Sequence, residues 1–136
     1  MENPKLIQLA GSAIIVDNKL LLLYKIKYQH YEFPGGKVEA GESIEDTAQR
    51  ETKEEIGCDV KFIKYLGHID FHHDSRDFQS HFFLAEIPPN QSPQITEPEI
   101  FRDHIWIPMN EYRNYTLAPN AIEFCERYHD GEIKKF

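Results

Sequence analysis

The feature that most constrains this chain is a strongly charged segment, residues 36–58, which contains a predicted helix over residues 44–56. Ser43 is a favourable N-cap residue, and Asp46 three positions later completes a capping-box pattern. Gly57 can close the C-terminus of the helix. The segment holds seven acidic and three basic side chains. Such a charge run is usually a solvated helix face, so the positions of the acids decide how it is interpreted.

Two of these acids fall on the side of the helix that should face the core. At about 100° per residue, Glu51 and Glu55 project to nearly the same side as Ile44 and Ala48. With Ile56, those two residues are the only apolar ones that could anchor the helix. Inward carboxylates four residues apart repel each other and lose solvation. A hard divalent cation relieves both penalties, because Mg²⁺ and Mn²⁺ prefer oxygen ligands.

The remaining sequence predicts strands and one further helix without a βαβ rhythm. Residues 6–16 and 20–27 are expected to form a hairpin around a turn at 17–19, and Pro34-Gly35-Gly36 is expected to break regular structure. Later segments predict two or three strands over 60–87 with a turn near 73–75, a proline-rich loop over 88–99, a short strand at 105–107 and a helix over 119–129. This order indicates an α+β protein or a layered sandwich.

Length and charge limit the remaining classes. The 136 residues fit one domain, residues 1–136, and the net charge of −8 argues against binding to nucleic-acid polymers or anionic membranes. Cys58 and Cys125 form no disulfide scaffold and no zinc motif. No apolar run reaches the length of a membrane span, and the N-terminus has no signal-peptide layout, so we expect a cytoplasmic protein.

The charged segment resembles the Nudix box. That pattern is Gly-x5-Glu-x7-Arg-Glu-U-x-Glu-Glu-x-Gly-U, where U is a bulky aliphatic residue. All seven fixed positions match here: Gly36, Glu42, Arg50, Glu51, Glu54, Glu55 and Gly57. A chance match is on the order of 10⁻⁸ per starting position. The lead-in over residues 31–37 also resembles that of the family, whereas Thr52 and Cys58 depart from it at the two U positions.

The resemblance covers essentially the whole chain and implies the Nudix fold. This fold is an α/β/α sandwich with a mixed central sheet, the box helix on one face and the C-terminal helix on the other. The implied activity is that of a divalent-metal-dependent hydrolase of nucleoside diphosphates linked to another moiety. The implied ligands of Mg²⁺ or Mn²⁺ are Glu51, Glu54, Glu55 and the carbonyl of Gly36.

For the catalytic groups, the resemblance leaves more than one possibility. Glu51 is our choice for the general base or for the residue that orients the attacking water. Some family members take the base from a later loop, which here offers Glu97 or Glu99, and surface acids in a loop are an equally good interpretation of either. Arg50 can hold Glu54 in place, and Glu42 is interpreted as a structural residue.

Two residues are candidates for substrate binding, Lys37 and Asn120. In MutT-like members an Asn near the position of Asn120 hydrogen-bonds a purine edge. The alternative, which we favour, is that Asn120 is the N-cap of the last helix, with Glu123 three residues later.

Four histidines crowd one predicted hairpin: His68, His72, His73 and His81. Their spacing is weak evidence for a transition metal, and histidines on a strand face near a turn are the preferred interpretation.

By elimination of other branches, the favoured activity is that of a MutT-like nucleoside triphosphate pyrophosphohydrolase that releases a nucleoside monophosphate and pyrophosphate. The alternatives are hydrolysis of ADP-ribose or of a dinucleoside polyphosphate, and a Nudix-fold sensor that binds a nucleotide without cleaving it. The expected partner is a small nucleotide, and the protein is expected to be a monomer or a homodimer.

Overall fold

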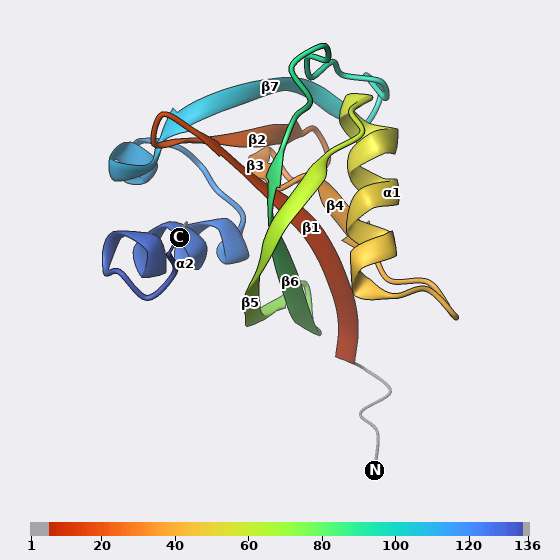
Figure 1. Ribbon diagram of the computed structural model, residues 1–136. Helices are drawn as coiled ribbons and strands as arrows, with labels where there is room; N and C mark the ends of the chain where they lie inside the picture. The colour runs from red at the N-terminus through yellow and green to blue at the C-terminus, as the bar shows by residue number, and fades with distance from the viewer. Residues whose placement is uncertain (1–5, 135–136) are drawn as a thin grey trace.

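Two amphipathic helices lie on opposite sides of a mixed sheet (Figure 1). The computed structural model describes residues 6–134. Its elements are β1 (Leu6–Val16), β2 (Lys19–Lys25), β3 (His30–Glu32), β4 (Gly35–Lys37), α1 (Ile44–Ile56), β5 (Lys61–His73), β6 (Arg76–Glu86), β7 (Phe101–Pro108), the 3₁₀ helix η1 (Met109–Asn114) and α2 (Pro119–His129). This arrangement confirms the expected sandwich. None of the helices in this part of the chain has the length and apolar character to cross a membrane.

The first hairpin forms as predicted but soon separates into two parts of the sheet. β1 and β2 pair only next to their turn, where Ile15 faces Leu20 and Val16 faces Lys19. Further from the turn, β1 pairs in parallel with β6, while β2 pairs with β3 and β7. The main strand order is β3-β2-β1-β6-β5. The divergence opens a space beside β1, and β4 pairs with β1 in that space.

The prediction that Pro34-Gly35-Gly36 breaks regular structure is correct for Pro34, which lies between β3 and β4, and wrong for the two glycines. Gly35 to Lys37 form β4, which pairs antiparallel with β1. Two glycines permit the close approach: a Cβ on Gly11 would lie 2.5 Å from the carbonyl oxygen of Pro34, and one on Gly35 would lie 2.6 Å from that of Ala10. Because both positions lack a Cβ, this short strand can lie against β1.

The later strands agree with the prediction in place but differ in length. Residues 60–87 hold two long strands, β5 and β6, and the turn between them lies at Asp74 and Ser75. β7 covers eight residues rather than the short strand expected at 105–107. Residues 88–99 contain no helix or strand, as their four prolines indicate.

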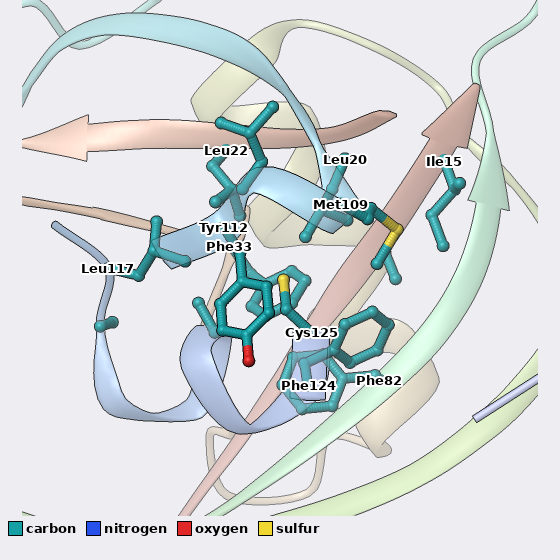
Figure 2. Packing of buried hydrophobic residues seen from close by; sticks show 14 of the residues in the cluster. Ile15, Leu20, Leu22, Phe33, Phe82, Met109, Tyr112, Leu117, Phe124 and Cys125 are labelled. Carbon is teal, nitrogen blue, oxygen red and sulfur yellow. The ribbon is translucent and has the colours of Figure 1, made fainter. Parts of the chain in front are cut away.

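The largest apolar cluster packs α2 and η1 against the sheet (Figure 2). Phe82 and Phe124 are fully buried, and their rings lie 5.2 Å apart. Phe33 contacts both rings, with centroid distances of 4.5 Å to Phe82 and 5.0 Å to Phe124. Full burial of a side chain of this size contributes about 1.5–3 kcal/mol. Phe33, which precedes Pro34, is therefore anchored in the core, and this anchor positions β4.

Candidate active site

The buried face of α1 is more polar than the apolar pattern predicts. The helix begins at Ile44 after Ser43, whose side chain accepts a hydrogen bond from the Asp46 N–H at 3.0 Å, and Gly57 ends it in the left-handed conformation. Thr52 is fully buried and shares a 2.7 Å hydrogen bond with the hydroxyl of Ser12 on β1. The threonine at this departure from the family pattern thus ties the helix to the sheet.

Glu55 is the most buried acid of the helix. It is 3% exposed, and its carboxylate accepts a 3.0 Å hydrogen bond from the Gly35 N–H. Desolvation raises the pKa of Glu55 well above its usual value, and the Gly35 N–H opposes this rise. The negative charges of Glu51 and Glu32 raise the pKa of Glu55 further, while Lys25 lowers it. Glu55 therefore links α1 to β4, and a nearby cation would stabilise its charged carboxylate.

Arg50 organises the outer side of the same cluster. Its Nε and Nη2 donate to the two carboxylate oxygens of Glu42 at 2.7 and 2.9 Å, and its Nη1 donates to Glu51 at 3.0 Å. Contacts to Glu54 are longer, at 3.3 and 3.4 Å. Arg50 thus contacts Glu54 as expected, but its shortest contacts form a bidentate pair with Glu42, which the sequence did not indicate.

Glu42 is a structural residue of this cluster, as predicted. In addition to Arg50, it accepts a 2.6 Å hydrogen bond from the Thr47 hydroxyl. The guanidinium of Arg50 and the hydroxyl of Thr47 lower the pKa of Glu42 to about 2. The pair joins the loop before α1 to the middle of the helix.

Glu51 lies directly against Gly36. A Cβ on Gly36 would lie 2.4 Å from the carboxyl carbon of Glu51, so any other residue would displace that carboxylate. Desolvation raises the pKa of Glu51, Arg50 opposes the rise, and Glu54 and Glu97 add to it. Glu54 is about half exposed, with 52% of its side chain accessible. The three predicted ligands therefore share one helix but differ in burial.

The proline-rich loop returns to the C-terminal end of α1. The Gln94 N–H donates to the carbonyl of Ile56, and the Thr96 hydroxyl donates to the carbonyl of Glu54. Glu97 follows this contact in the loop, and its negative charge raises the pKa of Glu51. Glu99 is exposed. Of the two loop candidates for the base, Glu97 is the one whose charge raises the pKa of Glu51.

A cavity of about 280 Å³ lies between β4 and the start of α2. Gly35 and Gly36 are part of its wall, and they contact Glu55 and Glu51 on α1. Three basic side chains and one acid also line it: Lys25, Lys37, Arg76 and Glu32. In a chain of net charge −8, this local excess of positive charge fits an anionic ligand.

Asn120 also lines this cavity, and its predicted capping role is wrong. The N-cap of α2 is Ala118, no side chain caps the helix, and Pro119 is the first helical residue. Asn120 is 9% exposed, and its amide nitrogen donates to the Ser80 hydroxyl at 3.2 Å. Because Pro119 occupies the first helical position, Asn120 is already inside the helix and cannot be its N-cap. The cavity-lining position leaves the substrate-binding hypothesis for Asn120 open.

The four histidines of the β5–β6 hairpin have separate surroundings. His68 pairs with Asp70, His72 pairs with Asp77, and His81 bonds to Tyr65 and Gln8. His73 lines the cavity. Across residues 6–134 no group of three His, Cys, Asp or Glu side chains, the α1 glutamates included, is already arranged to hold a metal ion. The preferred interpretation as strand histidines therefore agrees with these contacts.

The residues predicted to hold a divalent cation fit that role by their chemistry. Glu51, Glu54 and Glu55 lie within about one turn of α1, and Glu51 touches Gly36, whose lack of a Cβ keeps that contact open. Oxygen donors of this kind suit Mg²⁺ or Mn²⁺. In this conformation the carboxylates of Glu51 and Glu54 bond to Arg50, and that of Glu55 bonds to Gly35.

Several cavity residues were missed by the sequence analysis: Lys25, Tyr28, His30, Glu32 and Arg76. They come from β2, the turn after it, β3 and the start of β6. No spacing rule connects these segments, because only the folded sheet brings them together.

Comparison with known proteins gives a family match over most of the chain. The family model described as NUDIX domain matches residues 7–128. Nudix hydrolase 2 of Arabidopsis thaliana is 27% identical over 138 residues, covering 93% of this chain and 50% of that protein. The 8-oxo-dGTP diphosphatase of Buchnera aphidicola is 37% identical over 62 residues, covering 46% of this chain and 50% of that protein.

The matched segments thus span about half the length of these two relatives. Among solved structures, the MutT protein of Methanosarcina mazei has a similar fold, with a TM-score of 0.81. It is 19% identical, and the match covers 98% of this chain and 100% of that one.

Proposed function

The chain belongs to the Nudix hydrolase family, and from this premise we propose that it is a metal-dependent pyrophosphohydrolase that cleaves a nucleoside triphosphate into a nucleoside monophosphate and pyrophosphate. One observation carries the proposal. Acids on the inner face of α1 contact Gly35 and Gly36 of β4, and the same two glycines line a cavity bordered by basic side chains. If the phosphate chain of a nucleotide crosses these glycines, its nucleoside would lie in the cavity and its anhydride bond would lie beside the α1 acids.

The binding residues follow from the charges on each side of these two glycines. Lys37, Lys25 and Arg76 offer ammonium and guanidinium donors to phosphate oxygens. Glu51, Glu54, Glu55 and the carbonyl of Gly36 would hold Mg²⁺ or Mn²⁺. When bound, that cation neutralises the phosphate charge and lowers the pKa of a water molecule.

Glu51 is the proposed general base. It is partly shielded from solvent, with 20% of its side chain exposed, and Arg50 orients one carboxylate oxygen at 3.0 Å. As water attacks phosphorus, its proton passes to the Glu51 carboxylate and the phosphoanhydride P–O bond breaks. Arg50, fixed by Glu42 from the other side, keeps Glu51 in position. Glu97 is the alternative base in the loop after β6.

The similarity to the relative named 8-oxo-dGTP diphosphatase supports a purine nucleoside triphosphate as the substrate of this chain. A panel of nucleotides with Mg²⁺ tests this choice, with pyrophosphate, phosphate and monophosphate measured separately. The panel contains GTP, dGTP, 8-oxo-dGTP, ADP-ribose and a dinucleoside tetraphosphate. We expect pyrophosphate from a triphosphate. AMP and ribose phosphate from ADP-ribose would redirect the proposal to that substrate class, and binding without turnover of any nucleotide would favour a sensor.

A further inference from the structure

Two turns that are far apart in the sequence meet at the edge of the cavity. Tyr28 lies in the turn between β2 and β3, and His73 ends β5 at the turn before β6. Their rings pack edge to face with centroids 5.4 Å apart. His30, which is buried, adds a third ring 5.4 Å from Tyr28 and 6.3 Å from His73. All three side chains line the cavity.

Each ring is held by its own turn. In the β5–β6 turn, Asp74 and Ser75 both have positive φ, at 54° and 63°, as a tight hairpin requires. Two residue pairs further along the strands, Phe71 stacks on Phe78 at 4.9 Å with an interplanar angle of 11°. In the other turn, the Gln29 N–H donates to the carbonyl of Lys25 at 2.9 Å. The backbone of each turn therefore has a defined geometry at the position from which its ring projects.

Exposure separates these rings from ordinary core aromatics. Tyr28 is 38% exposed although it faces a cavity, and His73 is partly exposed. Lys25 and Arg76 line the same cavity, so positive charge accompanies the rings. Aromatic rings beside basic groups match a ligand that joins a flat ring to a phosphate, which is the chemistry of a nucleotide.

We propose that Tyr28 and His73 form a stacking platform for the base of the nucleotide and so determine its affinity. His30 adds a third ring beside them, buried and hydrogen-bonded to Glu32 at 2.8 Å. The inference rests on the proposed function for the identity of the ligand, but it assigns a role to two residues that lie outside the charged segment.

The test measures binding without turnover. The full chain with Mg²⁺ is titrated with GMP and, separately, with ribose 5-phosphate, which lacks the base, while histidine ring signals are followed by NMR. The signal of His73 is identified by its loss in His73→Ala. We expect GMP to shift the His73 signal and ribose 5-phosphate to leave it unchanged. His72, one residue away but turned to Asp77, provides the internal control and should not move with either ligand.

Variants make the test quantitative. Tyr28→Ala and His73→Ala should each raise the Kd for GMP about fivefold to a hundredfold, as expected for loss of base stacking. The Kd for ribose 5-phosphate should not change. Tyr28→Phe should keep near-native affinity because it retains the ring, and His72→Ala is the matched surface control.

Equal shifts of His73 by both ligands would overturn the platform, as would a Kd for GMP that changes less than twofold in both alanine variants. Turnover of a triphosphate without a GMP-specific shift at His73 would overturn the platform alone. The shift without any turnover would support the platform and overturn the proposed function.

Discussion

Replacement of Glu55 by Gln tests the electrostatic account of the α1 carboxylates. The side chain is 3% exposed and accepts a hydrogen bond from the Gly35 N–H. Glutamine preserves the volume and an oxygen acceptor but carries no charge. In the absence of metal, the change should therefore leave the free energy of unfolding unchanged or raise it.

The size of this effect has a ceiling. Burial raises the pKa of Glu55 above its reference value of 4.5. Above that reference value, a carboxyl that stays protonated in the native state lowers the free energy of unfolding by about 1.4 kcal/mol for each pH unit. At about pH 7.5, three such units limit the gain from Glu55→Gln to about 4 kcal/mol.

The sign of the pH dependence follows from linkage. A raised native pKa means that the native state binds more protons than the unfolded state above about pH 4.5. This contribution to stability is fully present below that pH and is lost as the pH rises through the native pKa. The wild-type protein should therefore lose stability with rising pH relative to Glu55→Gln.

Urea unfolding in EDTA at about pH 5 and about pH 7.5 measures this difference. Glu45→Gln, an exposed change on the same helix, should stay within about 0.5 kcal/mol of wild type at both values. With Mg²⁺ restored, Glu55→Gln should lose turnover by orders of magnitude. A metal-free Glu55→Gln protein that is more than about 1 kcal/mol less stable than wild type, with an unchanged pH slope, would refute the reasoning.

Three further outcomes are expected. Thr52→Val should lower the free energy of unfolding by about 1–3 kcal/mol, because it leaves the buried Ser12 hydroxyl unpaired. In urea titrations, the Ser12→Ala/Thr52→Val double variant should recover most of that loss. Since the pKa of Glu42 is lowered to about 2, the stability from its pair with Arg50 should be complete above about pH 4.5 and decline as the pH falls through about 2. A smaller acid-induced loss of unfolding free energy in Glu42→Gln than in wild type would confirm this. Mg²⁺ at about a hundred times its Kd should stabilise the protein by about 2.7 kcal/mol in thermal melts, and EDTA should abolish turnover; an unchanged Tm would contradict a metal site.

Local sequence signals account for most of the fold. Ser43 and Gly57 act at the ends of α1 as their residue types predict, because capping depends on neighbouring residues in the chain. The turn at Asp74 and Ser75 is local in the same way. By contrast, β4 depends on Gly11 and Gly35 meeting across the sheet, which no local pattern contains.

The candidate site shows the same division. The inward position of Glu55 follows from helix geometry, whereas the bidentate pair between Arg50 and Glu42 depends on how the loop before the helix folds back. Asn120 was interpreted as a cap because its residue type favours that role, but Pro119 begins the helix one position earlier. Tyr28 and His73 meet only because β2 and β5 belong to one sheet.

The most direct test of the central claim compares Glu51→Gln with Glu45→Gln in one assay. Glu51 touches Gly36 and Arg50 beside the cavity, whereas Glu45 is exposed on the same helix. Pyrophosphate release is measured with Mg²⁺ on the nucleotide that the wild-type protein cleaves fastest. We expect Glu45→Gln to match wild type and Glu51→Gln to be slower by orders of magnitude. Equal rates for the two variants would contradict the assignment of the α1 carboxylates as the catalytic centre.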